Sequence, residues 1–166
     1  MDSDVGQFIA GLVTGEGCFF ITLQMNHGAK WQVTCGFSIR MRADDRELVK
    51  MVWQALNFSG NIFDVLTKRY QYQWDSIRRH DSVGLQIRSV KELVQCVIPF
   101  FERYPLRGQK RRNYELWKEA VQIMERGEHR TGEGFQRIME LKEQMNRYQG
   151  QDEDDENLSE ETDSEN

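Results

Sequence analysis

The sequence has only three cysteines, three histidines and two prolines among its 166 residues. The cysteines and histidines are Cys18, Cys35, Cys96, His27, His80 and His129. Because the cysteines are odd in number and far apart, we expect neither a disulfide framework nor a zinc site, and a reducing compartment is favoured. The histidines are equally scattered, and no two of them have the spacing of a pair of metal ligands.

A hydrophobic run long enough to cross a membrane is also missing. No stretch of about 18 apolar residues occurs, so we expect no membrane span. Residues 1–4, Met-Asp-Ser-Asp, are acidic and lack the basic and apolar regions of a targeting peptide.

Acidic residues outnumber basic ones, 27 to 22, but they are unevenly distributed. Residues 151–166 hold nine of the acids and no base, so the rest of the chain carries a charge of about +4. A block of like charges is typical of disorder. We therefore expect one folded domain over residues 1–150 and an acidic disordered tail over 151–166. A mildly basic domain suits a nucleic-acid-binding protein.

The chain is organised around residues 8–19, Phe-Ile-Ala-Gly-Leu-Val-Thr-Gly-Glu-Gly-Cys-Phe. The uncharged run predicts a helix that is apolar on all sides, and such a helix has to be buried on more than one side. Gly11 and Gly15 lie four residues apart, where small side chains let a second helix approach closely. Glu16 falls at the end of this helix. The alternative interpretation is an ordinary core helix that ends at a glycine cap with an exposed glutamate.

Strand and helix patterns alternate along the rest of the chain. The predicted strands are 19–25, 31–41, 61–68 and 83–88, and a helix is predicted between the second and third of them, over 45–57. Apolar residues of both parities leave the register of the third strand open. An Asp44–Glu47 capping box and a Ser89–Glu92 capping box each predict the start of a helix, and Pro99 should kink the second one. Two further helices follow, the first ending at Gly127.

The polar face of the predicted strands is basic. Between residues 30 and 42 this face holds no acid and ends in Arg40 and Arg42, which is unusual for a surface that contacts only water. Two-stranded ribbons of this kind fit the major groove of DNA and reach the base edges. The residues predicted to contact DNA from the strands are Thr22, Gln24, Asn26, Lys30, Gln32, Thr34, Ser38, Arg40, Arg42, Gln86 and Arg88. An ordinary solvated sheet face is the alternative.

Residues 9–17, Ile-Ala-Gly-Leu-Val-Thr-Gly-Glu-Gly, resemble the LAGLIDADG motif of the homing endonucleases. Residues 98–101, 105–110 and 134–146 also resemble later blocks of that family, so the resemblance covers roughly residues 8–147. It implies an α+β fold of the order αββαββα. In this fold a saddle-shaped antiparallel sheet binds DNA, and helices cover the other face of the sheet.

The resemblance also implies roles for individual residues. Glu16, the acid before the last glycine, would bind the catalytic metal. Lys110 would lie near the scissile phosphate and polarise the water network or stabilise charge in the transition state. The alternative for Lys110 is a solvated basic face at the start of a helix. Arg111 and Arg112 would contact the DNA backbone. The motif helix would form a dimer interface, for which the predicted residues are Phe8, Gly11, Leu12 and Gly15.

One carboxylate per chain is too few to stabilise both the attacking water and the leaving oxygen of a phosphodiester. Two copies of Glu16, brought together by a twofold helix pair, would share Mg²⁺ or another divalent cation, which would also relieve their mutual repulsion. The sequence therefore predicts a homodimer that acts on a long pseudo-palindromic site in double-stranded DNA.

Two positions depart from the family pattern. Thr14 replaces the first Asp of the family's name, at a position that is generally structural. Met41 stands where the family often has a Gln that helps to order active-site water. Methionine cannot order water through hydrogen bonds. Either a neighbour such as Arg40 or Arg42 orders the water instead, or the activity is weakened.

Three functions therefore compete: an intron-encoded site-specific DNA endonuclease, an intron RNA maturase and a catalytically inactive DNA-binding protein. The presence of Glu16 and Lys110 favours the endonuclease. By association with the family, we expect an organelle, either chloroplast or mitochondrion.

Overall fold

The computed structural model describes residues 2–25, 31–66 and 81–146. The predicted acidic tail lies outside these residues, and so do Asn26 and Lys30, two of the residues predicted to contact DNA. None of the helices within the described ranges is both long and apolar enough to span a bilayer.

Six helices and four strands carry the described fold. They are α1 (Ser3–Glu16), β1 (Gly17–Met25), β2 (Trp31–Arg42), α2 (Arg46–Ala55), β3 (Asn61–Val65), β4 (Ser82–Ile87), α3 (Val90–Glu92), α4 (Ile98–Arg103), α5 (Gly108–Glu125) and α6 (Gly132–Asn146). The strands form one sheet in the order β1-β2-β4-β3, and every neighbouring pair is antiparallel. The predicted α+β class and the order αββαββα are confirmed.

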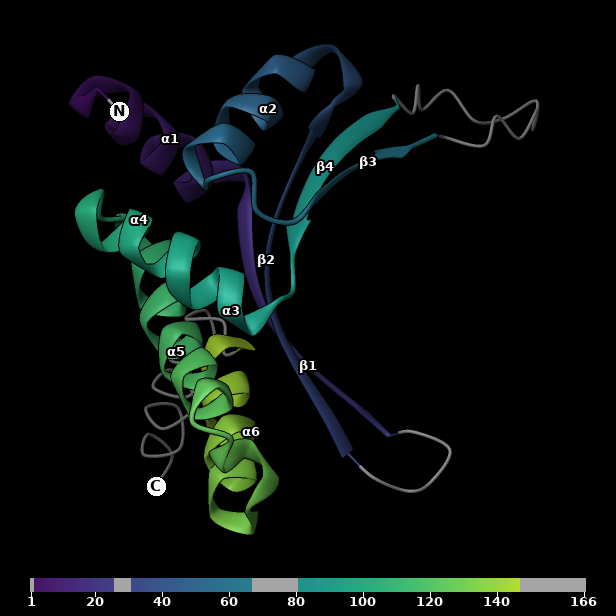
Figure 1. Cartoon of the computed structure of the whole chain (residues 1–166), viewed down its shortest axis with the longest axis vertical. Helices are drawn as coiled ribbons and strands as arrows, with labels where there is room; N and C mark the ends of the chain where they lie inside the picture. Colours follow the sequence, from purple (N-terminus) through teal and green to yellow (C-terminus); the bar gives the residue numbers. More distant parts are fainter. Residues whose placement is uncertain (1, 26–30, 67–80, 147–166) are drawn as a thin grey trace, which may run out of the picture.

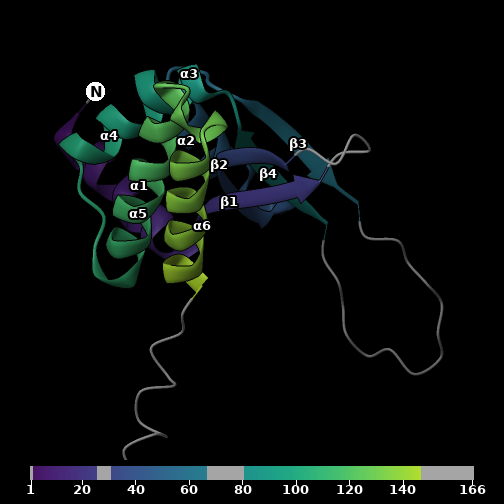
Figure 2. The same cartoon turned by 90° about the horizontal axis from the view of Figure 1, so that it is seen from below.

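The helices gather on one side of the strands in two views related by 90° (Figure 1, Figure 2). Burial along β2 shows why. Val33, Cys35, Phe37 and Ile39 are buried beneath the helices, whereas Arg40 is exposed. The alternation predicted from the sequence thus separates a helix-covered face of the sheet from an open face. Burial also raises the pKa of the Cys35 thiol to about 12, so this cysteine is an uncharged core residue.

The structure determines the register of β3, which the sequence left open. Ile62 lies opposite Leu85 and therefore faces the helices, and Phe63 lies opposite Gly84 on the open face. Asp64 also faces the helices, where its carboxylate pairs with Arg46 at the start of α2. This ion pair and the packing of Ile62 explain how a short edge strand is held in one register.

The junction between α1 and β1 is anchored by a cluster of aromatic rings around Phe19. Its ring centroid lies 4.9 Å from that of Trp117, 5.2 Å from that of Phe37 and 5.3 Å from that of Tyr114. Trp117 and Phe37 are fully buried. Aromatic pairs at such distances stabilise a core beyond their buried area. The first residues of β1, and with them the end of α1, are consequently held in place by the largest side chains of the core.

The starts of two helices differ from the sequence predictions. Helix α1 starts at Ser3, earlier than the uncharged run, with Asp2 as its N-cap. The Asp44–Glu47 capping box is wrong, because Asp44 belongs to a short 3₁₀ turn (Ala43–Asp45) and its carboxylate pairs with Arg42 at 2.8 Å. Helix α2 begins after that turn, without a side-chain cap.

The second capping box is half confirmed. The Ser89 hydroxyl accepts a hydrogen bond from the Glu92 backbone N–H, but the Glu92 carboxylate accepts one from the N–H of Gly60. Pro99 is not preceded by an ordinary α-helix. A π-helical segment, Leu93–Val97, joins α3 to α4. A proline lacks a backbone N–H, and its ring clashes with the carbonyl four residues earlier. The π-helical segment before Pro99 accommodates both effects because its turn is wider than that of an α-helix.

Gly6 is the point of closest approach between α1 and the core. A Cβ built on Gly6 would overlap the ring of Tyr104, which is buried. We expect Gly6→Ala to lower the free energy of unfolding by about 1–2 kcal/mol, because overpacking outweighs the gain in helix propensity. Gly132→Ala is the control, since a Cβ there meets nothing within 4 Å. Urea unfolding of both variants checks this, and equal stability would contradict it.

Candidate active site

Glu16 is the last residue of α1 and is exposed to solvent. The chain passes from this helix into β1 without a loop, which requires a glycine at position 17. The Gly17 N–H donates to the Val13 carbonyl, and a Cβ on Gly17 would lie 2.5 Å from Val13 Cγ1 and 2.7 Å from the Val13 oxygen. The Gly-Glu-Gly sequence therefore presents Glu16 on a tightly held turn.

Lys110 reaches this turn from a distant part of the chain. Its ammonium donates a hydrogen bond to the carbonyl oxygen of Gly17, 93 residues earlier in the sequence. The structure thus brings the two residues predicted to be catalytic, Glu16 and Lys110, to the same junction. Because an ammonium has three donors, two of them are left for water or a phosphate oxygen.

The N-terminus of α5 concentrates positive charge at this junction. Arg107 is its N-cap residue and makes no capping hydrogen bond through its side chain, and no acid lies in the first turn of the helix. Lys110 and Arg111 lie in that turn and Arg112 directly follows it. Both arginines are exposed. Free backbone N–H groups and the helix dipole already favour an anion there, so added cations are unfavourable unless an anion binds. The arrangement suits a phosphate group.

The outer face of α1 is left open by the rest of the chain. A Cβ built on Gly11 or on Gly15 meets nothing within 4 Å, whereas the opposite face of the helix is buried through Ile9 and Val13. Phe8 is 50% exposed. None of the residues that the structure describes therefore requires Gly11 or Gly15 to be glycine.

The predicted dimer residues lie along this open face at helical spacing, although Leu12 is partly buried against the core. Sequence reasoning missed Val5, which is 37% exposed and extends the same stripe by one turn. It was missed because the helix was expected to begin later. Thr14 lies beside the stripe, and its hydroxyl donates to the Ala10 carbonyl at 2.7 Å. The hydroxyl is thus satisfied within the helix.

The residues predicted to contact DNA that lie within the described strands share the open face of the sheet. The cross-strand pairs are Thr22–Thr34, Gln24–Gln32, Ser38–Gln86, Arg40–Gly84 and Arg42–Ser82. Sequence reasoning missed further residues of this face, among them Phe20, Asn61 and Phe63. Asn61 and Phe63 could not be assigned without the register of β3, and the alternation of β1 was read from the polar residues Thr22, Gln24 and Asn26 without Phe20.

Met41 packs against the core from the helix-covered face. Its neighbours Arg40 and Arg42 both point to the open face, and Arg42 pairs with Asp44. The register places this end of β2 beside the junction, because Gly17 lies opposite Ile39. Of the two arginines, Arg40 is therefore the nearer to Glu16 along the ladder. In the described part of the chain it has no acidic partner, unlike Arg42.

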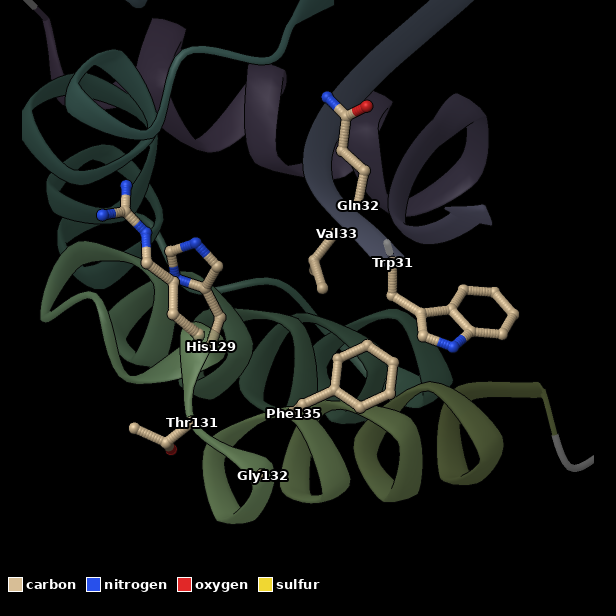
Figure 3. A pocket seen from close by; sticks show the side chains of 8 residues that line it. Trp31, Gln32, Val33, His129, Thr131, Gly132 and Phe135 are labelled. Atoms are coloured by element: carbon tan, nitrogen blue, oxygen red, sulfur yellow. The ribbon is translucent and has the colours of Figure 1, made fainter. Parts of the chain in front are cut away.

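A hollow of about 800 Å³ lies at the opposite end of the β1–β2 ribbon (Figure 3). Trp31 and Phe135 line it next to each other, with ring centroids 6.1 Å apart, and His129 lines it from the turn before α6. None of the described residues that line it carries a carboxylate. Since Trp31 pairs with Met25, eight residues along β1 from Gly17, the hollow lies about 26 Å from the Glu16 junction. It is separate from the candidate active site.

The donor set of the junction fits a magnesium-type cation. Mg²⁺ prefers carboxylate oxygens and is commonly held by one or two of them together with water and substrate phosphates. Glu16 supplies one exposed carboxylate. Among the described residues, no group of three or more His, Cys, Asp or Glu side chains could hold a metal ion.

Comparison with known proteins connects this geometry to a family. A family model described as LAGLIDADG endonuclease matches residues 9–121. The probable intron-encoded endonuclease 3 of Neurospora crassa is 30% identical over 139 residues, which are 82% of this chain and 24% of that protein. The chain spans about a quarter of the length of the curated relatives that it matches.

Solved structures share the fold. The homing endonuclease I-TnaI is 28% identical with a TM-score of 0.71, and the match covers 86% of this chain and 88% of that chain. The LAGLIDADG meganuclease I-AabMI, bound to uncleaved DNA, is also 28% identical with a TM-score of 0.69. That match covers 85% of this chain but 44% of the meganuclease.

Proposed function

Because the chain belongs to the LAGLIDADG endonuclease family, we propose that it is a site-specific homing endonuclease, encoded within an intron, that cuts double-stranded DNA as a homodimer. The observation that carries this proposal is the contact between Lys110 and the Gly17 carbonyl beside the exposed Glu16. This contact places the ammonium of Lys110 near the carboxylate-bearing Glu16, at the end of α1. The outer face of α1 is open.

The open face of α1 supports a dimer. Gly11 and Gly15 would let the α1 helices of two copies approach closely, near the short end of the usual interaxial range of about 8–10 Å. A twofold axis along this pair would place the two Glu16 carboxylates near each other. The similar length of I-TnaI, and the roughly double length of I-AabMI, also fit a unit that functions in pairs.

In this mechanism Glu16 of each copy would hold a divalent cation, most simply Mg²⁺. A bound cation supplies charge stabilisation at the attacking and leaving oxygens of a phosphodiester. The backbone at Glu16 is held by the turn at Gly17 and by the Phe19 aromatic cluster, so the start of the side chain does not depend on a loop. A backbone held in this way lowers the cost of assembling the site when DNA binds.

Lys110 would contribute positive charge at the scissile phosphate. The Gly17 carbonyl orients its ammonium, and the remaining donors would stabilise the charge that develops on the phosphate oxygens. Arg111 in the first turn of α5, and Arg112 directly after it, would hold the adjacent backbone phosphates. The four strands would lie in the major groove, and two copies would read a long pseudo-palindromic site.

A catalytically inactive DNA-binding protein is the second candidate, and Met41 is the observation that favours it. Its side chain packs on the core, so it cannot order water near Glu16. An intron RNA maturase on the same fold is the third candidate function. The organellar location is proposed on the association with the family alone.

A plasmid cleavage assay tests the proposed function. Duplexes that the full chain retains from a random-sequence pool are cloned into a supercoiled plasmid, which is then incubated with the protein and Mg²⁺ or with EDTA. Linear plasmid in Mg²⁺ alone is expected. Specific binding without cleavage in any divalent metal would establish the inactive alternative, and binding of intron RNA without DNA binding would establish the maturase.

Lys110→Met is expected to slow cleavage about 100-fold, the usual effect of losing one donor to the transition state. The dimer and the fold should be retained, because the apolar stem of the side chain is preserved. Lys50→Met, which removes the same charge from an exposed ion pair on α2, is the control and should cleave normally. Single-turnover rates on the selected site measure the difference, and equal rates for both variants would contradict the role of Lys110.

A further inference from the structure

The open face of the sheet carries two rows of the same three residue types, Phe, Gly and Arg, and each row crosses three strands. In the first row, Phe20 on β1 lies opposite Gly36 on β2. Arg88 completes this row, because it directly follows Ile87, whose partner on β2 is Phe37.

The second row is formed from the other edge of the sheet. Phe63 on β3 lies opposite Gly84 on β4, and Gly84 lies opposite Arg40 on β2. In both rows the phenylalanine comes from an edge strand and the glycine from a central strand, and the arginine comes from β2 in one row and from directly after the end of β4 in the other. The two rows therefore run in opposite directions across the sheet.

Each phenylalanine ring lies over the glycine of its row. A Cβ on Gly84 would lie 2.6 Å from Phe63 Cζ, and a Cβ on Gly36 would overlap the end of the Phe20 ring. Glycine weakens the interior of a strand, and it is found where another group has to approach the backbone closely. Here the approaching group is an aromatic ring on the polar face of the sheet.

The arginine of each row reaches across the glycine to the ring. The guanidinium carbon of Arg40 lies 6.0 Å from the centroid of the Phe63 ring. That of Arg88 lies 6.0 Å from the centroid of the Phe20 ring. This is the outer range of a cation–π contact. Both arginines are exposed, so the rings restrain the guanidinium groups without removing them from solvent.

The two rows are related by a local twofold axis. The central cross-strand pair is Ser38–Gln86, and in an antiparallel ladder the axis through this pair exchanges Gly36 with Gly84 and Arg88 with Arg40. The same device thus occurs twice, once on each side of the pair. It spreads two arginines from adjacent central strands toward opposite edges of the sheet.

We propose that these rows are two guanine-reading units, in which Phe20 and Phe63 are positioning residues that hold Arg88 and Arg40 before DNA binds. The inference rests on the proposed binding of DNA by this face. A guanidinium pairs in a bidentate manner with guanine O6 and N7 in the major groove. An unrestrained arginine loses rotamer freedom when it makes this contact, and a restrained one loses less.

The two units read different positions. The Arg40 row lies next to the Gly17–Ile39 pair, at the end of the sheet that carries Glu16. The Arg88 row lies four residues farther along β2, or about 13 Å. Arg40 therefore reads a base pair nearer to the centre of the site than the one that Arg88 reads.

Selection from a pool of random-sequence duplexes, repeated for matched variants of the full chain, tests the proposal. Arg40→Lys keeps the charge but loses the two parallel N–H donors of the guanidinium. Phe63→Leu keeps an apolar side chain but loses the aromatic ring that contacts Arg40. Both are expected to weaken guanine preference at the inner position about 3- to 10-fold, and neither should affect the outer one. Phe20→Leu and Arg88→Lys should weaken guanine preference at the outer position and leave the inner one unaffected. The salt dependence of binding should not change, because no charge is lost.

The double variant Phe63→Leu with Arg40→Lys should lose no more preference than Arg40→Lys alone, since the ring then has nothing to position. In DNA-free protein, NMR relaxation of the arginine Nε–H groups should show Arg40 more mobile in Phe63→Leu and Arg88 unchanged. This measurement also shows that the variant is folded.

Three outcomes would overturn the inference: an unchanged preference in Phe63→Leu, an unchanged preference in Arg40→Lys, or a uniform loss of binding over all sequences, which would mean phosphate contact. If wild-type protein binds no DNA, the proposed function itself fails. Specific binding that is indifferent to Phe63→Leu overturns only the positioning role.

Discussion

Glu16→Gln is expected to lower DNA cleavage by about three orders of magnitude or more while leaving DNA binding intact, because the charge that would hold the divalent cation is lost. The amide has the size and the hydrogen-bonding capacity of the carboxylate, so the turn at Gly17 should be preserved. Binding should be equal or slightly tighter, since two carboxylates near the DNA backbone no longer repel phosphate. Cleavage rates and equilibrium binding are measured on the same preparation.

The matched control is Glu125→Gln. Glu125 is also an exposed glutamate at the last position of a helix, α5, but it lies at the opposite end of α5 from Lys110. Exposed substitutions of this kind change the free energy of unfolding by about 0.5 kcal/mol or less, and cleavage should stay normal. Full cleavage by Glu16→Gln would end the proposed mechanism. Loss of binding together with cleavage would assign Glu16 to folding or dimerisation instead.

The second large effect is expected from Gly11→Leu, which should dissociate the dimer without unfolding the chain. A Cβ on Gly11 meets no described atom of its own chain within 4 Å, and leucine is a better helix former than glycine by up to about 1 kcal/mol. Any destabilisation must therefore arise between copies. Overpacking costs about 1–3 kcal/mol at each of the two Gly11 positions, which raises the dissociation constant of the dimer about 30-fold or more.

Sedimentation equilibrium of the DNA-free protein, with urea unfolding of the same samples, checks this prediction. Gly132→Leu is the control, because the space around Gly132 is equally open but lies at the start of α6. The wild type and the control should be dimeric at micromolar concentration, and cleavage should fall with the dimer in Gly11→Leu. A monomeric wild type, or a dimer that tolerates leucine at position 11, would refute an interface at this face of α1.

The strongest local patterns of the sequence were sufficient to predict much of the fold. Strict alternation along β2 identified the core-facing and open-facing residues, because a strand has only two faces and its period is two. The helix that ends at Glu16 followed from one uncharged run with glycines at helical spacing. These features depend on residues close together in the chain, and local geometry is enough to interpret them.

The sequence alone determined the family resemblance, the αββαββα order and the candidate residues Glu16 and Lys110. Only the tertiary structure decided the register of β3, since Ile62 and Phe63 are both apolar and no alternation distinguishes them. It also decided that Lys110 meets Gly17 and that Phe63 covers Gly84 beside Arg40. These contacts join residues that are far apart in the chain. They depend on how sheet and helices pack, and a pattern of neighbouring residues holds no information about that packing.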